Sequence, residues 1–183
     1  MGIVQLPAKR ILRLLRANGK ALKELEKLSG VEIFVKEDPK GDDGSVEVSS
    51  ADSEKEWAAE QALKAIDLGF EPKNAFKLFK EDYYLDIVDL GAAMHGKANA
   101  VSRQKARIIG TEGSAKQKIE EMSEASLALS DDDRVGIIGE FDEVKAAKEA
   151  IIRLLEGANH AGVFTYLKKE KDLRRSRRLG ARI

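Results

Sequence analysis

The feature that most constrains the fold of this 183-residue chain is an internal repeat. Residues 14–35, LLRANGKALKELEKLSGVEIFV, align without a gap on residues 108–129, IIGTEGSAKQKIEEMSEASLAL, and their apolar positions coincide. Further along, residues 58–69, AAEQALKAIDLG, match residues 146–157, AAKEAIIRLLEG. A repeated core pattern indicates a repeated structural unit, so the sequence predicts a tandem duplication with about 70 residues per copy.

Each copy is predicted to follow the order β-α-α-β-β-α. In the first copy, IVQL reads as a strand, and Pro7 opens the helix PAKRILRLLR. A second helix runs from Lys20 to Leu28, and Gly30 ends it. The stretches VEIFV and SVEVS are strands joined by the turn PKGDDG, and a long amphipathic helix follows from Ser53 to Leu68.

The second copy repeats this order. YYLDIVDL is its first strand, and its helix pair meets at Gly110 to Gly113. SLALS and RVGIIG form a hairpin around DDD, and Phe141 to Leu155 is the last helix. Between the copies, EPKNAFKLFKEDY is predicted to be a connecting helix opened by Pro72. The fold class is therefore α+β, and the two domains are expected to pack against each other. The predicted divisions are residues 1–70, the connecting helix 71–83, the second domain 84–167 and a basic C-terminal tail 168–183.

Composition excludes several kinds of chemistry. The chain contains no cysteine, which excludes disulfides, thiolate zinc sites and cysteine nucleophiles. No stretch approaches the roughly 20 apolar residues of a membrane span, and MGIVQLPAKR lacks the apolar core of a signal peptide. We therefore expect a cytoplasmic protein.

Charge is unevenly distributed along a chain whose net charge is +0. Residues 168–183 hold eight Lys or Arg against Glu170 and Asp172, so the remainder of the chain is acidic. A second basic run surrounds Gly19 near the start of the chain. Such runs either form solvated helix faces or contact an anionic partner, and the sequence leaves both readings open.

The stretch RIIGTEGSAKQKIEEMSEASLAL carries the clearest functional signal. Without a Cβ at Gly110 or Gly113, a phosphodiester backbone can approach closely, and the helix that follows offers free N–H groups. This stretch and the order β-α-α-β-β-α resemble the type I KH domain. Its Gly-x-x-Gly loop clamps about four single-stranded nucleotides, whose bases lie in an apolar groove beside the second strand.

The two predicted loops differ. In the first copy the loop reads RANG, so Arg16 stands where the leading glycine belongs. This copy is either a degenerate domain kept for packing or one in which Arg16, Lys20 and Lys23 contact phosphates. In the second copy both glycines are present, but Thr111 and Glu112 occupy positions where such loops usually carry a basic residue.

The resemblance assigns RNA contacts to two sets of residues. The set around the second loop is Arg103, Lys105, Arg107, Ile109, Gly110, Thr111, Glu112, Gly113, Ser114, Lys116 and Lys118. The set in the first loop and the basic tail is Arg13, Arg16, Ala17, Asn18, Gly19, Lys20, Lys23, Arg174, Arg175, Arg177 and Arg178.

The rest of the chain narrows the resemblance to one family. The joining segment GFEPKNAFKLFKEDYYLDIVDLG and the closing LLEGANHAGVFTYLKK, together with the two domains, resemble archaeal relatives of the Dim-two, or Partner-of-Nob-one, ribosome biogenesis proteins. These proteins are also similar to the Krr-one family. The resemblance implies binding to the 3′ region of the small-subunit ribosomal RNA precursor, help to the Nob-one endonuclease there, and a link to initiation factor two alpha.

The sequence does not favour an enzyme. His95 and His160 lie far apart and outside any metal-binding spacing, and Asp131 to Asp133 occupy a turn where Asp is favoured for geometry. No Ser-His-Asp order, Walker loop or dinucleotide fingerprint is present. We expect no catalysis, no metal and no cofactor.

A protein-interaction scaffold is the alternative function. In this reading degenerate KH folds serve as docking surfaces, with initiation factor two alpha as one candidate partner. The apolar side chains of GANHAGVFTYL are expected to be at least half exposed, and to pack on the other copy or, as a second possibility, on a partner. They are Val163, Phe164, Tyr166 and Leu167.

Overall fold

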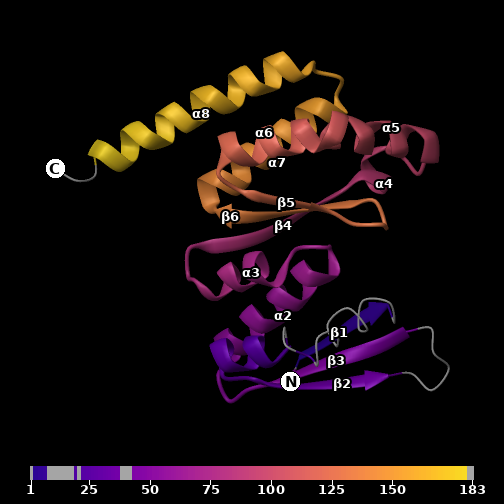
Figure 1. Ribbon diagram of the computed structural model, residues 1–183, viewed down its shortest axis with the longest axis vertical. Helices are drawn as coiled ribbons and strands as arrows, with labels where there is room; N and C mark the ends of the chain where they lie inside the picture. Colours follow the sequence, from indigo (N-terminus) through magenta and orange to yellow (C-terminus); the bar gives the residue numbers. More distant parts are fainter. Residues whose placement is uncertain (1, 8–18, 20–21, 38–42, 181–183) are drawn as a thin grey trace. The chain divides into compact units, whose positions relative to one another are not determined.

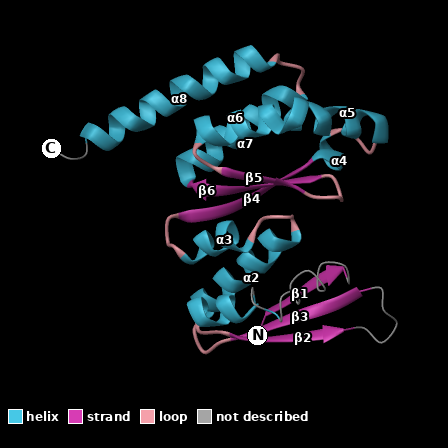
Figure 2. Ribbon diagram, viewed as in Figure 1, coloured by secondary structure: helices cyan, strands magenta, loops and turns pink. Residues whose placement is uncertain are grey.

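The computed structural model describes residues 2–7, 19, 22–37 and 43–180. The chain divides into two compact units, Met1–Glu81 and Asp82–Ile183. Each unit contains a three-stranded antiparallel sheet and its own helices (Figures 1 and 2). The predicted α+β class with two small sheets is therefore confirmed.

The first unit has its strands in the order β1-β3-β2, so the last strand of the sequence lies in the middle. Residues 22–29 are helical. Pro7, which was predicted to open a helix, is instead the last residue of β1, and the rest of that predicted helix lies outside the described residues. The connecting segment forms two short turns of helix that contact α2 and so belong to this unit. The elements are β1 (Gly2–Pro7), β2 (Glu32–Glu37), β3 (Asp43–Ser49), α2 (Ser53–Asp67), α3 (Pro72–Ala75) and the 3-10 helix η1 (Phe76–Phe79).

The second unit repeats this sheet, with the order β4-β6-β5. The hairpin and the helix Phe141–Leu155 lie where the sequence predicts them. Its strands are β4 (Tyr83–Asp89), β5 (Ser126–Leu129) and β6 (Arg134–Glu140). Its helices are α4 (Leu90–Ala93), α5 (Ala98–Ile109), η2 (Thr111–Gly113), α6 (Ser114–Ser123), α7 (Phe141–Leu155) and α8 (His160–Gly180).

The duplication extends to individual hydrogen bonds. In the first unit, the Ser29 hydroxyl donates to the Leu25 carbonyl at 2.6 Å. In the second unit, the Ser123 hydroxyl donates to the Ile119 carbonyl at 2.7 Å, at the aligned positions. The same hydroxyls accept from backbone N–H groups two residues on, at 3.3 and 3.2 Å. Each serine therefore closes the end of the helix before the edge strand in the same way.

A glutamate also ties each of these helices to its edge strand. Glu26 accepts from the backbone N–H of Ile33 at 3.2 Å. Glu120 accepts from the backbone N–H of Leu127 at 2.7 Å. These positions align in the repeat, and both bonds satisfy a donor on a strand that has a partner on one side only.

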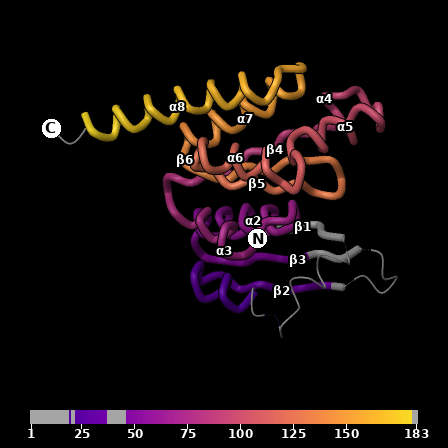
Figure 3. The backbone as a smooth tube through the Cα atoms, turned by 45° about the horizontal axis from the view of Figure 1, so that its top comes forward, coloured from indigo at the N-terminus to yellow at the C-terminus, as the bar shows by residue number. Residues whose placement is uncertain are grey.

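Helices α5, α6 and α7 cover one face of the second sheet, and α8 packs against α6 and α7 (Figures 2 and 3). Helix α8 was not predicted, and it continues through residues 168–180, where the sequence analysis placed a tail. The expected exposure of Val163 and Leu167 is wrong, because both are buried in the core of the second unit. Their spacing of four residues places them on one side of α8, which faces that core. Phe164 and Tyr166 are half-buried and pack against the same core.

Among the described residues, no helix has the length and apolar character needed to cross a lipid bilayer.

Candidate functional site

The loop from Gly110 to Gly113 joins α5 to α6 through an unusual backbone path. Gly110 ends α5 with φ 72° and ψ 176°, while its N–H donates to the Ala106 carbonyl at 2.8 Å. Glu112 has φ 53° and Gly113 has φ 80°. The left-handed conformation costs a residue with a Cβ about 1 kcal/mol, so Glu112 carries local strain inside the loop.

The two glycines are needed for different reasons. A Cβ on Gly110 would lie 2.6 Å from the Cβ of Ala115 and 2.7 Å from its backbone nitrogen. A Cβ on Gly113 would meet no atom of the described residues within 4 Å. Gly110 therefore lets the loop pack closely on the start of α6, whereas Gly113 supplies only the left-handed turn and leaves open space above the backbone.

On the side of the loop that faces β5, two lysine side chains bond to other residues of the second unit. Lys105 donates to the Ser130 carbonyl at 2.7 Å and to Asp133 Oδ1 at 3.1 Å, both in the turn between β5 and β6. Lys116 pairs with Glu120 at 3.1 Å, one turn along α6. These two ammonium groups have anionic or carbonyl partners on the protein itself.

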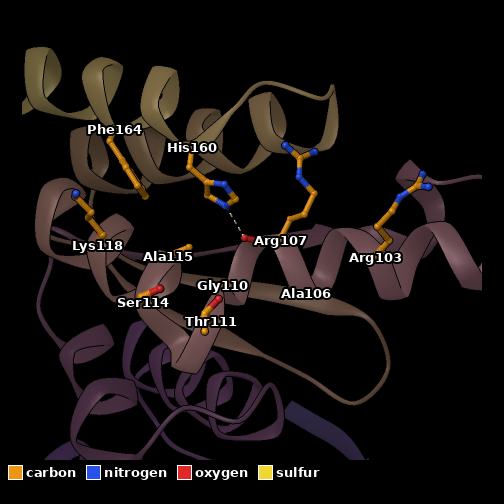
Figure 4. A pocket seen from close by; sticks show the side chains of 10 residues that line it. All are labelled: Arg103, Ala106, Arg107, Gly110, Thr111, Ser114, Ala115, Lys118, His160 and Phe164. Carbon is orange, nitrogen blue, oxygen red and sulfur yellow. Dashed lines mark hydrogen bonds between the residues drawn. The ribbon is translucent and has the colours of Figure 1, made fainter.

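On the other side of the loop, an open groove of about 650 Å³ separates α5 and α6 from the start of α8 (Figure 4). Within the described part of the chain, no Asp or Glu lines it, and three basic residues do. The residues that line it are Arg103, Ala106, Arg107, Gly110, Thr111, Ser114, Ala115, Lys118, His160 and Phe164.

Arg107 connects α5 to the end of α7 beside this groove. Its guanidinium donates to the Leu154 carbonyl at 2.7 Å and to the Ala158 carbonyl at 2.6 Å, around the end of α7. A cation at a helix C-terminus also interacts favourably with the helix dipole. In addition, the Arg107 carbonyl lies 2.9 Å from His160 Nε2 at the start of α8 (Figure 4).

Two other basic side chains stand at opposite ends of the groove (Figure 4). Lys118 places its ammonium 4.6 Å from the centre of the Phe164 ring, a cation–π contact. Arg103 is exposed on α5. The hydroxyl-bearing Thr111 and Ser114 are exposed between them.

The structure brings most of the predicted residues of the second loop to these two sides. Glu112 is exposed and does not line the groove, so its carboxylate stands outside it. Ile109 is half-buried at the last turn of α5. The site residues that the sequence analysis missed are Ala106, Ala115, His160 and Phe164. The i, i+4 spacing of His160 and Phe164 was a usable signal, but only with a helix predicted there.

The residues predicted in the first loop lie mostly outside the described residues; they are Arg13, Arg16, Ala17, Asn18 and Lys20. Gly19 is described and has φ 67°, matching the left-handed Gly113. Lys23 is exposed on the helix that follows. Whether this copy contacts RNA stays a prediction.

Three of the predicted tail arginines contact their own unit. Arg174 is 4% exposed, and its Nη2 donates to the Met122 and Ser123 carbonyls, each at 3.0 Å.

Arg177 pairs with Asp142 at 3.3 Å. Arg178 forms ion pairs of 3.0 to 3.6 Å with Glu124, Glu140 and Glu143. Arg175 is exposed. This part of α8 is therefore anchored on the C-terminus of α6 and the N-terminus of α7.

The acidic turn between β5 and β6 also has internal roles. Asp132 accepts from the Arg134 Nε at 2.9 Å and from the Ser130 hydroxyl, while Asp133 pairs with Lys105. Asp133 adopts φ 61°, as Asp tolerates in turns. Across the residues that the structure covers, no cluster of three or more His, Asp or Glu has the arrangement of a metal site.

Residues 84–172 match a family model described as a eukaryotic-type KH domain, KH-domain type I. Together with the repeated sheet and the glycine loop, this match defines a KH-domain protein. The chain is 32% identical over 174 residues to a KH domain-containing protein of Methanocaldococcus jannaschii, which covers 93% of this chain and 74% of the relative. The matched model describes the second KH domain of the Partner-of-Nob-one proteins, so this chain belongs to the Dim-two, or Partner-of-Nob-one, family.

Two further similar proteins have names or titles that refer to ribosomal RNA. The pre-rRNA-processing protein pno1 of Emericella nidulans is 32% identical over 114 residues, which cover 60% of this chain and 43% of the relative. The chain thus spans less than half the length of that relative. A crystal structure of an a/eIF2alpha–aDim2p–rRNA complex from Pyrococcus horikoshii contains a chain 34% identical, with a TM-score of 0.81 and coverage of 93% of both chains.

Proposed function

We propose that this protein binds single-stranded RNA through the loop Gly110 to Gly113 of its second KH domain. The RNA we propose is the 3′ region of the small-subunit ribosomal RNA precursor, bound during ribosome assembly. The protein acts as a binding factor that assists a processing endonuclease and does not itself catalyse a reaction. The names of its relatives, a pre-rRNA-processing protein and a complex with rRNA, support this RNA class.

The observation that carries the proposal is the geometry of the loop. Gly110 and Gly113 keep side chains off a segment that leads directly into α6, where the first N–H groups have no partner within the helix. Anions are stabilised at such a helix N-terminus. A phosphodiester backbone can therefore lie against the loop and the N-terminus of α6.

A second candidate is a protein-interaction role with initiation factor two alpha. It is favoured by one observation, that the related chain from Pyrococcus horikoshii occurs in a complex with a/eIF2alpha as well as rRNA. The two roles are compatible, because one protein can hold an RNA and a protein at once. The two roles can be distinguished by testing whether changes in the glycine loop affect binding to initiation factor two alpha.

The test uses a charge placed in the loop without a steric clash. Because Gly113 has open space around its Cβ position, Gly113→Asp introduces a carboxylate, and Gly113→Asn is its isosteric control in the same left-handed conformation. Wild-type protein should bind a single-stranded RNA of the small-subunit 3′ end more tightly than the same sequence as a duplex. Gly113→Asp should weaken that binding at least tenfold relative to Gly113→Asn.

Two results count against the proposal. Equal RNA affinity of Gly113→Asp and Gly113→Asn would show that the RNA contact lies away from the loop. Failure of the wild-type protein to bind any single-stranded RNA, with binding to the initiation factor retained, supports the protein-interaction role instead.

A further inference from the structure

The groove between the glycine loop and α8 has features that the loop does not need for clamping a phosphodiester backbone. We propose that this groove binds one further nucleotide, both phosphate and base, of an RNA strand that crosses the loop. The inference rests on the proposed function, because it extends the RNA contact beyond the side of the loop that faces β5.

The groove lies on a different side of α5 from the β5-facing contacts. Arg103 and Ala106 line the groove, whereas Lys105 reaches the turn between β5 and β6. At 100° per residue, Arg103 and Ala106 share a side of α5 that Lys105 does not. On α6, Lys118 lines the groove while Glu120 bonds the strand β5. Gly110 and Thr111 also line the groove, so a strand that leaves the loop enters it directly.

The charge and size of the groove suit a nucleotide. Its charged lining residues in the described chain are all basic, and Arg103 and Lys118 stand at its two ends. Arg107 contributes further positive charge, although its guanidinium is already bonded to carbonyls. The volume of about 650 Å³ falls within the range of small-ligand pockets, and the lining offers a phosphate both cations and hydroxyls.

Phe164 supplies a surface for a base. It is half-buried at the start of α8, and its ring points toward α6 and Lys118 (Figure 4). Lys118 holds its ammonium over this ring at 4.6 Å. A cation–π contact at an exposed site is weaker than an ion pair with a phosphate, so an incoming nucleotide can draw the ammonium to its phosphate and stack its base on the ring.

His160 adds an acceptor, which the basic lining residues lack. Its Nε2 lies 2.9 Å from the Arg107 carbonyl, which can only accept, so Nε2 carries the proton. In the neutral ring this leaves Nδ1 as an acceptor. A ribose 2′-hydroxyl or a base N–H is a donor of the kind that such an acceptor recognises. Arg and Lys offer donors alone.

The first experiment measures how affinity depends on RNA length. Affinity for an oligonucleotide of about four residues, the length that a KH loop clamps, is compared with affinity for longer RNAs of the same sequence. Wild-type protein should gain about tenfold or more on lengthening, as expected for one stacked base. Phe164→Leu, which keeps an apolar side chain on the core, should lose most of that gain. Tyr166→Leu, an aromatic deletion two residues along α8 and outside the groove, should keep it.

The second experiment locates the added nucleotide. A longer RNA with a photoreactive thiouridine at one end or the other should crosslink to residues 160–164 from one of the two ends. With that RNA, Lys118→Gln should reduce the slope of log K against log salt by roughly 0.7, the value for one phosphate, whereas Lys169→Gln, exposed elsewhere on α8, should leave it unchanged.

The outcomes separate this inference from the proposed function. If the wild-type protein binds no single-stranded RNA of any length, the proposed function fails and the groove with it. If the short RNA binds but Phe164→Leu shows the same gain with length as the wild type, only the groove is overturned. Crosslinks confined to segments outside α8 also overturn it.

Discussion

A β-carbon placed on Gly110 would lie 2.6 Å from the β-carbon of Ala115, so the end of α5 rests on the start of α6 through a glycine. This contact sets the path of the whole loop. It also separates the two glycines of the motif, because Gly113 has no such neighbour. Substitutions of Gly110 and of Gly113 should therefore destabilise the second unit for different reasons.

Gly110→Ala should destabilise the second unit more than Gly113→Ala does. Gly113→Ala places a Cβ in the left-handed conformation, at a cost of about 1 kcal/mol. Gly110→Ala places one at φ 72° and ψ 176°, a region that almost only glycine adopts, at a cost of about 1–3 kcal/mol. Only Gly110→Ala adds overpacking against Ala115, which typically costs about 1–3 kcal/mol more. Chemical denaturation of both variants checks this. Equal losses in the free energy of unfolding would show that the contact with Ala115 relaxes without cost.

Arg107 was predicted from the sequence to contact RNA, but the structure gives its guanidinium to the Leu154 and Ala158 carbonyls. Arg107→Gln should therefore lower the free energy of unfolding, by about 1–3 kcal/mol for carbonyls left without their donor. Hydrogen exchange at the start of α8 should also become faster. The exposed Arg103→Gln is the matched control and should change RNA affinity more than stability. Loss of RNA affinity in Arg107→Gln with unchanged stability would instead support the predicted direct contact of Arg107 with RNA.

Arg174 anchors α8 on the C-terminus of α6, yet its Nε and Nη1 are buried without a hydrogen-bond partner within the described structure. Arg174→Ala should cost about 2–4 kcal/mol, because it leaves a cavity and two carbonyls without their donor. Arg174→Met should cost less, since it removes the same polar groups but fills the space that alanine leaves empty. The exposed Arg175→Ala should be near neutral in the same thermal and chemical unfolding series. A large loss in Arg175→Ala would show that the tail charge, not the buried contact, stabilises the unit.

The phenol of Tyr166 should ionise at a higher pH than an ordinary tyrosine. Burial, followed by the charge of Glu170, raises the pKa of its phenol above the ordinary value of 10.0. Because the folded pKa is the higher one, the neutral phenol stabilises the fold below pH 10, and this contribution is lost as pH rises through the folded pKa. Ultraviolet titration of tyrosinate, compared with Tyr166→Phe, measures the shift. Ionisation of Tyr166 at or below its ordinary pKa would contradict it.

The sequence predicted the repeat and its sheets because the apolar positions of the two copies coincide. The structure adds that the same Ser and Glu hydrogen bonds recur at aligned positions. It also predicted the glycine loop, since the backbone conformations at positions 110 and 113 favour glycine. These features are local in sequence, and pattern reasoning captures such features well.

The groove could not be predicted in the same way. It depends on α8, whose polar face and basic second half resemble a solvated tail until Val163 and Leu167 are seen to enter the core. The carbonyls that accept from Lys105 and Arg107 were also hidden, because they lie 25 or more residues away in the sequence. Charge alone does not show whether a cation faces solvent or a buried carbonyl.

The most direct test of the central claim is to follow the backbone amide signals of the labelled full chain by nuclear magnetic resonance while a single-stranded RNA of the small-subunit 3′ end is added. We predict that the largest changes fall on residues 110–116, the glycine loop and the first turn of α6. Smaller changes should appear at Lys118 and Phe164. Changes confined to other segments, with residues 110–116 unaffected at saturating RNA, would contradict the account.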